Sequence, residues 1–492
     1  MKKYITILLI ALISFSCSDD FVEVDPPFTV DSENFFLSEE DYYNGLIAVY
    51  DLLQSNYASV MLAEIASDDI NAGGESPTDV IGWQQIDRMI HTPINQQLRD
   101  VWNFNYAGVY RASFMVENKD NIEFDGKNQI LAEARFLRAF FNFNLVRFFG
   151  EIPIKPEGRF LLGEETSLPR ASIEDVYAYI EADLLFAIEN MSPSAQEVWR
   201  ANQFSAKALL GKVYLYQENF GAAAAELTDV INSGQFHLYG TQGNESYENL
   251  FEFVGENSAE SVFEIQYTGA LGASFDCLQC STGNVMVGFS GVRGYNGPTF
   301  EPGFGFILPR EDIYNAYNEN DLRRDVSILN IEEWAADNSA DFNIGNQDPD
   351  TGHTGYYNRK YIPRIAENEP DANLTQPNNY RAIRYADVLL MAAEALIRGG
   401  GNDELARGYV NQVRNRAGLD DLDSSGNALL ENIYSERRLE LVGEGHRFFD
   451  LVRTGRAAQN IEGFTANKNE VFPVPLEEIQ FSQGNWEQNA GY

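Results

Sequence analysis

Aromatic rings stand beside hydrogen-bonding side chains at several places that resemble loops. Trp83 lies between a glycine and two glutamines, Tyr295 occupies a Gly-Tyr-Asn-Gly turn, and Trp334 stands in a polar stretch. A flat ring can stack on the C–H face of a sugar, while amides, carboxylates and guanidinium groups bond its hydroxyls. These three rings are therefore candidate carbohydrate-stacking residues.

Five further side chains complete the candidate set: Asp68, Asp69, Tyr356, Tyr357 and Arg359. The two aspartates could accept hydrogen bonds from hydroxyls, or could cap a helix end, or could be solvated. The tyrosines could offer rings and the arginine could donate, although the same segment could be a structural strand. Trp102, with Tyr106 and Val109 at helical spacing, is instead expected in the core.

Motifs for enzyme chemistry are missing from the sequence. It contains no G-x-S-x-G, no H-E-x-x-H and no phosphate-binding G-x-x-x-x-G-K motif. Carboxylates are so frequent that no pair spaced for glycoside hydrolysis stands out. Asp348-x-Asp350-x-Gly352 is similar to the start of a calcium loop, but Arg359 stands where its glutamate belongs. We therefore predict a non-catalytic protein without a metal or cofactor, with calcium left open.

The first residues have the pattern of a secretory leader. Two lysines precede an apolar run, Ile5–Ile13, and small residues lead to Cys17. The run is shorter than the about 20 residues that span a bilayer. A cysteine at the cleavage position predicts a lipoprotein with residues 1–16 removed and Cys17 acylated, although a chance cysteine in a cytoplasmic protein is the alternative.

Charge and cysteine content limit the partners. The formal net charge is −39, which argues against nucleic acid and weakly favours a neutral glycan. Apart from Cys17, only Cys277 and Cys280 remain, in a C-x-x-C spacing. A local disulfide is expected in an oxidising compartment. A redox pair, a zinc site and two unpaired thiols are the alternatives.

Helical spacing of apolar residues covers most of the chain. Ser38-x-x-Asp41 resembles a capping box at the start of the first helix. Leu210-Gly211-x-x-Tyr214 matches the core of a tetratricopeptide unit, a pair of helices that cross at small residues. Residues 67–93 resemble a long loop. Further helices are predicted over residues 98–119, 129–149, 172–190, 204–234, 385–416 and 432–442.

Residues 240–379 differ from the rest, because they are rich in glycine, asparagine, proline and aromatic residues with little periodicity. Only Ser261–Tyr267 alternates like a strand. We predict a lipidated tether over 17–37 and a single domain over 38–492. An all-α scaffold with tetratricopeptide-like pairs would cover 38–239 and 380–492. The segment 240–379 would be a loop-rich insertion with minor β-structure.

The chain resembles the SusD/RagB family of surface lipoproteins. The segments that carry the resemblance are Ala132–Ala139 with Leu145–Pro153, Tyr385–Ala395, Glu436–Leu441 with Gly445–Arg453, and Phe472–Pro475. Ser18–Phe21 is also similar to the export signal of Bacteroidota surface lipoproteins. No single motif is decisive, but their order and spacing are specific and cover nearly the whole mature chain.

This resemblance implies that the tetratricopeptide-like pairs form a right-handed superhelical scaffold, and it implies several functional properties. It implies an outer-membrane, cell-surface lipoprotein that binds a polysaccharide or oligosaccharide. It also implies a SusC-like, TonB-dependent barrel as partner, on which the protein acts as a lid. The loop around Trp83 would contribute to the glycan site, and the matching segments would be scaffold. A peptide-binding, RagB-like uptake protein and a glycoside hydrolase on a helical scaffold are the alternatives.

Overall fold

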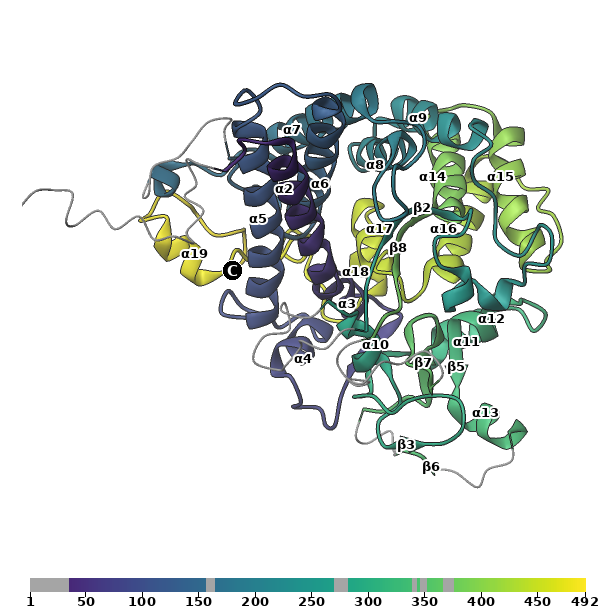
Figure 1. Ribbon diagram of the computed structural model, residues 1–492. Coiled ribbons are helices and arrows are strands. Elements are labelled where there is room, and N and C mark those ends of the chain that lie inside the picture. The colour runs from purple at the N-terminus through teal and green to yellow at the C-terminus, as the bar shows by residue number, and fades with distance from the viewer. Residues whose placement is uncertain (1–34, 156–163, 270–281, 339–342, 346–351, 366–375) are drawn as a thin grey trace, which may run out of the picture.

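A helical scaffold carries a loop-rich end in the computed structural model (Figure 1). The structure describes residues 35–155, 164–269, 282–338, 343–345, 352–365 and 376–492. The scaffold helices are α2 (Glu39–Asp51), α3 (Tyr57–Ile65), α5 (Gln96–Glu117), α6 (Lys127–Phe149), α7 (Ile173–Asn190), α8 (Gln203–Tyr216), α9 (Phe220–Asn232), α14 (Tyr385–Arg398), α15 (Asp403–Arg416), α16 (Gly426–Leu441), α17 (Arg447–Arg453), α18 (Ala457–Asn460) and α19 (Leu476–Phe481).

Several helices begin where their capping residues predict. The Ser38 hydroxyl accepts a hydrogen bond from the Asp41 amide, and the Asp41 carboxylate accepts one from the Ser38 amide at 2.8 Å. At α7, the Ser172 hydroxyl accepts from the Asp175 amide at 3.1 Å. Each bond satisfies an amide that lacks a partner within its helix. The predicted capping box is therefore confirmed.

Helix α6 is buried on nearly all sides, as its apolar sequence predicts. Its arginines meet a buried carboxylate on α7. The Arg138 guanidinium donates to both oxygens of Asp183 at 2.7 Å, and Arg135 donates to the same group at 3.0 Å. Trp102 on α5 packs against Phe149 with ring centroids 5.0 Å apart, so its predicted core position is confirmed.

The helix pair α8–α9 shows why Gly211 belongs to a tetratricopeptide-like motif. Gly211 faces Leu227 so closely that an added Cβ would lie 2.5 Å from the Leu227 Cγ. The helices can approach this closely only because position 211 has no side chain. The pair α14–α15 covers the second predicted unit, and the all-α, tetratricopeptide-like scaffold is confirmed.

Replacing Gly211 by alanine is expected to lower the free energy of unfolding by about 1–2 kcal/mol. Overpacking a core typically costs about 1–3 kcal/mol, and the better helix propensity of alanine offsets part of that loss. Gly221 on α9 is the matched control, since an added Cβ there meets nothing within 4 Å. Urea unfolding should show Gly221→Ala as neutral or stabilising. Equal losses in the two variants would contradict the close crossing.

Short elements form the loop-rich insertion and its junctions. They are η4 (Tyr247–Asn249), η5 (Phe253–Gly255), α10 (Val285–Ser290), α11 (Glu311–Asn315), α12 (Arg323–Ser327), α13 (Ile331–Asp337) and η8 (Arg359–Tyr361). The strands pair antiparallel as β1 (Ile70–Gly73) with β4 (Phe306–Pro309), β2 (Ser261–Ile265) with β8 (Tyr380–Arg384), β3 (Tyr295–Asn296) with β6 (Asn343–Ile344), and β5 (Ile328–Asn330) with β7 (Tyr356–Asn358). The other short 3-10 turns are η2 (Leu52–Asn56) and η3 (Glu164–Ser167).

The structure confirms a predicted strand and corrects a predicted loop. The predicted strand Ser261–Tyr267 is confirmed as β2, which ends at Ile265. The prediction that residues 67–93 form only a loop is wrong, because the segment contains β1 and the short helix α4 (Ile81–Asp87). Both elements depend on the insertion: β1 pairs with β4, and α4 packs beside them. A local pattern cannot show a partner more than 200 residues away.

The C-terminal segment returns to the scaffold. The Phe472 amide donates to the Phe148 carbonyl at 2.7 Å, and Leu476 donates to the Pro93 carbonyl at 2.9 Å. Among the described residues, no helix combines the length and apolarity needed to cross a membrane. In Figure 1 most scaffold helices occupy the upper part, with α19 at the left, and α4, α10, α13 and strands β3 and β6 lie along the lower end.

Candidate functional site

The loop-rich end, formed by α4, α10 to α13 and strands β1 and β3 to β7, holds the predicted site residues that come from distant parts of the sequence (Figure 1). The β1–β4 pair joins the early segment to the insertion, with Gly73 opposite Phe306. Ion pairs reinforce this junction. Arg293 donates to Asp79 at 3.2 Å, and Arg310 donates to Asp87 at 3.0 Å.

Trp83 lies on α4 with only 8% of its surface exposed. Its ring packs edge-to-face against Phe289 and Phe306, at centroid distances of 5.0 and 4.8 Å. A sugar could stack on this ring only if these neighbours moved. The glycan contact predicted for Trp83 therefore stays a prediction, while its observed role is to anchor α4 to the insertion.

Asp68 and Asp69 face arginines of the C-terminal region. The Arg447 guanidinium binds both oxygens of Asp68 at 2.7 Å. Arg438 binds Asp69 with Nε to Oδ1 at 2.9 Å, and Asp69 is almost completely buried. Because paired guanidinium groups already use these carboxylates, their observed role is to hold the end of α3 against α16 and α17. Their predicted contact with sugar hydroxyls stays a prediction.

Tyr295 and Trp334 come together, although they are far apart in the sequence. Their ring centroids are 6.2 Å apart, and Phe300 lies 5.1 Å from Trp334. Tyr295 and Phe300 are buried in a small apolar cluster of the insertion, and half-buried Trp334 packs on that cluster from outside. Trp334 thus has the supported but accessible position that stacking on a sugar requires.

Tyr356 and Tyr357 point to opposite sides of β7, as neighbours on a strand do. Tyr357 is completely buried in the same cluster as Tyr295. Tyr356 is half-buried and lies 4.7 Å from the Tyr314 ring, tilted by 32°. Arg359 is also half-buried and donates to the Asp325 carbonyl at 2.5 Å. Only Tyr356 and Arg359 of this segment therefore reach the surface.

Tyr314 and Tyr356 form a second aromatic pair with a polar neighbour, Glu333 on α13. The Tyr314 hydroxyl donates to the Glu333 carboxylate at 2.8 Å, and Arg324 lies 5.1 Å from the Tyr314 ring centroid. Burial, and then the bond to Glu333, raises the pKa of Tyr314 to about 12, so its hydroxyl remains a donor at neutral pH. Sequence reasoning missed Tyr314, Arg324 and Glu333, because only the β5–β7 pairing brings them beside Tyr356.

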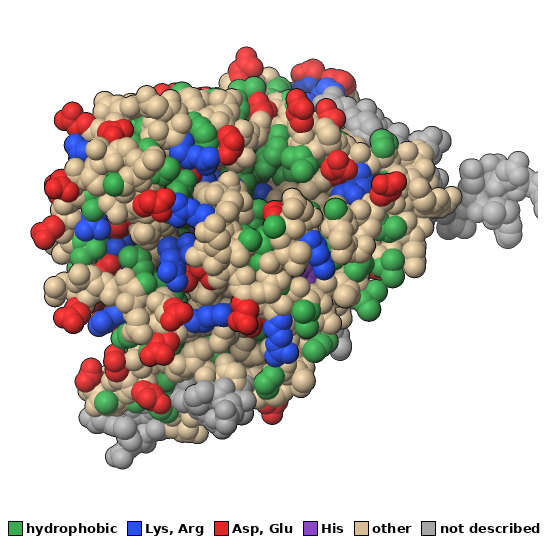
Figure 2. All heavy atoms as spheres, turned by 180° about the vertical axis from the view of Figure 1, so that it is seen from behind, with side chains coloured by type: hydrophobic (Ala, Val, Ile, Leu, Met, Phe, Trp, Pro, Cys, Tyr) green, Lys and Arg blue, Asp and Glu red, His purple; other side chains and the backbone are tan. Residues whose placement is uncertain are grey.

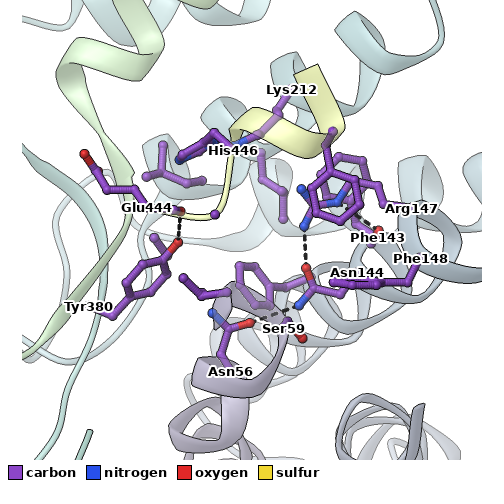
Figure 3. A pocket seen from close by; sticks show the side chains of 17 residues that line it. Asn56, Ser59, Phe143, Asn144, Arg147, Phe148, Lys212, Tyr380, Glu444 and His446 are labelled. Carbon is purple, nitrogen blue, oxygen red and sulfur yellow. Dashed lines mark hydrogen bonds between the residues drawn. The ribbon is translucent and has the colours of Figure 1, made fainter. Parts of the chain in front are cut away.

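A small cavity lined by polar and aromatic side chains lies within the scaffold, away from these residues (Figure 3). Its volume is about 40 Å³, which is enough for a few waters but too small for a sugar ring. Arg147 lies between the Phe143 and Phe449 rings, 4.4 Å from each centroid, and donates to the Asn144 amide oxygen at 2.5 Å. The Tyr380 hydroxyl donates to the Glu444 carbonyl at 2.6 Å. The cavity lies where the N-terminal helices meet the C-terminal part of the scaffold, and its polar side chains bond to one another across this contact.

Some predictions concern residues that the structure does not describe. Cys17, the Cys277–Cys280 pair and the aspartates of the calcium-like segment, Asp348 and Asp350, lie outside the described residues. Within the described part of the chain, no three His, Cys, Asp or Glu side chains gather in a way that could hold a metal ion. The leader, lipid anchor, disulfide and domain boundaries stay predictions.

Together, the architecture defines a helical-repeat protein with an aromatic, loop-built surface at one end. Residues 20–215 match the family model described as "Starch-binding associating with outer membrane", and residues 306–492 match the model described as "SusD family". A solved "Laminarin binding SusD-like protein" is 34% identical, with a TM-score of 0.83, over 92% of this chain and 100% of that one.

Two further relatives are also similar over nearly the whole chain. Surface glycan-binding protein A from Bacteroides fluxus is 29% identical, with a TM-score of 0.81, and covers 92% of this chain and 100% of its own. SusD-like protein P38 from Formosa agariphila is 27% identical over the full length of both chains. The chain belongs to the SusD-like family, which confirms the resemblance seen in the sequence.

Proposed function

We propose that this protein captures a neutral glycan at the loop-rich end and does not cleave it. The observation that carries the proposal is the Trp334 ring, which is half-buried and is supported by Phe300 and Tyr295. Tyr356 on β7 offers a second half-buried ring beside Tyr314, whose hydroxyl donates to Glu333 on α13. Rings with adjacent hydrogen-bonding groups match the alternating C–H faces and hydroxyls of a sugar chain.

The ligand we propose is a neutral β-glucan of the laminarin type. Its support is the 34% identity to the laminarin-binding relative over that protein's whole length. The net charge of −39 fits an uncharged ligand better than an anionic one. On the rear face, Lys and Arg side chains are interspersed with Asp and Glu rather than gathered into one basic surface (Figure 2).

The cellular setting of this function is also a proposal. Acylation at Cys17 would tether the protein to the outer membrane, facing outward, and a multiply acylated terminus anchors stably. The captured glycan would pass to a SusC-like, TonB-dependent barrel, on which this protein sits as a lid. Family membership and the leader-like N-terminus support this setting. The protein would bind the glycan without cleaving any of its bonds.

Replacing Trp334 by alanine is expected to weaken glycan binding at least about tenfold, or about 1.4 kcal/mol. The stacking surface is lost, whereas the buried cluster behind it keeps its own contacts. Affinity gel electrophoresis with laminarin and a panel of other neutral and anionic polysaccharides would measure the change. Tyr110→Ala is the control, since Tyr110 is an exposed ring on α5, away from the loop-rich end. Unchanged retardation of Trp334→Ala would contradict the proposed site.

A further inference from the structure

A second hollow lies on the scaffold, where α2, the segment before α8 and the end of β2 meet. Its volume is about 440 Å³, within the range of small-molecule sites, about 300–1,000 Å³. None of the candidate residues at the loop-rich end lines it. The lining residues are Tyr43, Ile47, Tyr50, Asp51, Leu53, Gln54, Trp199, Glu264, Ile265, Gln266, Thr268 and Thr282.

Two half-buried aromatic rings in this hollow are held in place by one carboxylate. The Trp199 indole N–H donates to Glu197 Oε2 at 2.8 Å, and the Tyr43 hydroxyl donates to Glu197 Oε1 at 2.9 Å. Trp199 also stands edge-to-face on buried Tyr50, with centroids 4.9 Å apart. A ring fixed before a ligand arrives loses little conformational freedom on binding. Trp199 is therefore a preorganised apolar surface.

The apolar side of the hollow continues from the rings onto α2. Ile47 is 42% exposed although it is a large aliphatic residue, and it lies one helical turn from Tyr43 on the same face. Isolated exposed apolar residues are ordinary, but here Ile47, Tyr43 and Trp199 line one concave surface. The surface is suited to the C–H faces of a ring.

The remaining lining groups are amides, hydroxyls and carboxylates. Gln54 donates to the Gln266 carbonyl at 3.1 Å, and the Thr268 and Thr282 hydroxyls are 3.0 Å apart. Among the described residues, the lining contains Asp51 and Glu264 but no lysine or arginine, which favours a neutral ligand over an anion. The nearest guanidinium groups already have partners, since Arg111 pairs with Asp51 at 3.1 Å and Arg200 binds Glu133. A neutral polyol fits this combination of apolar surface and hydrogen-bonding groups.

We infer that this hollow is a second carbohydrate site, which binds a short stretch of a neutral oligosaccharide. The choice of a carbohydrate as ligand rests on the proposed function. The evidence for a binding site is the arrangement of Trp199, Ile47 and the polar groups around them. Two separate sites on one chain would hold a long glycan at two points, which raises its avidity without strengthening either contact.

Fluorine NMR of the mature chain from Ser18, labelled with 5-fluorotryptophan, tests this inference. The sequence has five tryptophans, and Trp199→Phe assigns the resonance of interest. Titration with laminarihexaose is expected to shift the Trp199 resonance saturably, and Trp334→Ala should leave that shift unchanged. In a Gln54→Ala, Thr268→Val double variant, the laminarihexaose concentration at the midpoint of the Trp199 titration should rise at least about tenfold, which corresponds to about 1.4 kcal/mol. Gln412→Ala, on α15, is the control and should leave it unchanged.

The two proposals can fail separately in this experiment. If the Trp334 resonance shifts and that of Trp199 does not, the second site is overturned and the proposed function stands. If the Trp199 shift persists at the same midpoint in the double variant, it reports a remote effect and the second site is again overturned. If neither resonance shifts and no glycan is retarded, both proposals fall. Unchanged resonances of the buried Trp83, Trp102 and Trp486 show that each variant is folded.

Discussion

Replacing Arg384 by alanine is expected to lower the free energy of unfolding by about 3–5 kcal/mol. Arg384 is almost completely buried, and its guanidinium donates to Glu260 at 2.6 Å, to Glu440 at 3.0 Å and to Glu444 at 2.7 Å. Truncation would leave these carboxylates buried with one cation fewer. This loss is larger than the net stabilisation that the intact ion pairs provide, because a buried charge without its partner is strongly unfavourable.

The position of Arg384 explains why its loss should affect the whole molecule. Arg384 ends β8, and Glu260 precedes β2. Glu440 lies in the last turn of α16, and Glu444 lies just after that helix. The cluster therefore joins the insertion to the C-terminal helices. Arg416 extends it, with ion pairs to Glu260 at 2.8 Å and to Glu440 at 2.5 Å.

An exposed ion pair provides the matched control for Arg384. Arg99 lies 3.3 Å from Glu477, and both side chains are well exposed to solvent. Exposed pairs contribute about 0–1 kcal/mol, so Arg99→Ala should change stability little. Urea unfolding followed by circular dichroism would compare the two variants with the parent chain. A loss below about 1 kcal/mol for Arg384→Ala would show that the buried cluster does not hold the fold together.

Acid is expected to destabilise the protein already between pH 6.5 and 4, partly through two buried histidines. Burial, and then the nearby Lys212 ammonium, lowers the pKa of His446 to about 3. Burial, with Lys468 nearby, lowers the pKa of His91 to about 4. Both remain neutral in the folded chain, whereas in the unfolded chain they gain protons near pH 6.5. The contribution of these two histidines to stability is therefore full above pH 6.5 and is lost as the pH drops toward their folded pKa values.

The expected slope is about 1.4 kcal/mol per pH unit for each proton bound only by the unfolded chain. His446→Gln should flatten the curve, because a glutamine cannot be protonated and its amide oxygen can accept from Lys212 as Nδ1 does at 3.2 Å. His237→Gln, at a half-buried histidine, is the control. Urea unfolding at pH 7, 6, 5 and 4 would measure the curves. Parallel curves for the parent chain and His446→Gln would rule out this histidine as a cause.

Burial of Glu64 has the opposite effect at higher pH. Burial raises the pKa of this carboxyl to about 8, although backbone amides of Gly445 and Gly443 donate to it and lower the pKa in part. The folded chain then keeps a proton that the unfolded chain loses above pH 4.5. Its contribution is therefore full below pH 4.5 and is lost as the pH rises toward 8. The histidines and Glu64 together favour an intermediate pH of greatest stability.

The scaffold was predictable from local signals. Ser38 and Asp41 mark the start of α2 because capping depends only on residues within one turn. Gly211 marks a helix crossing because only a small residue permits it. Apolar residues on nearly every face of residues 129–149 predict a buried helix, and α6 is buried on nearly all sides.

The surface of the site was less predictable, because it depends on pairs far apart in the sequence. Trp83 resembles a loop ring, yet Phe289 and Phe306 cover it from more than 200 residues away. Asp69 resembles a free carboxylate, yet Arg438 binds it. Trp334 was chosen for the polar stretch around it, and the structure shows it half-buried against Phe300 and Tyr295, so its contact with a sugar stays a prediction. The hollow beside Trp199 had no signal in the sequence.

The central claim is that the loop-rich end binds a neutral glycan through Trp334. Isothermal titration of the mature chain with laminarihexaose tests it most directly, with Trp334→Ala and Tyr110→Ala in parallel. We predict saturable binding in the micromolar to millimolar range that Tyr110→Ala keeps and Trp334→Ala weakens at least about tenfold. Only dilution heat from a folded parent chain, or equal affinity in Trp334→Ala, would contradict the claim.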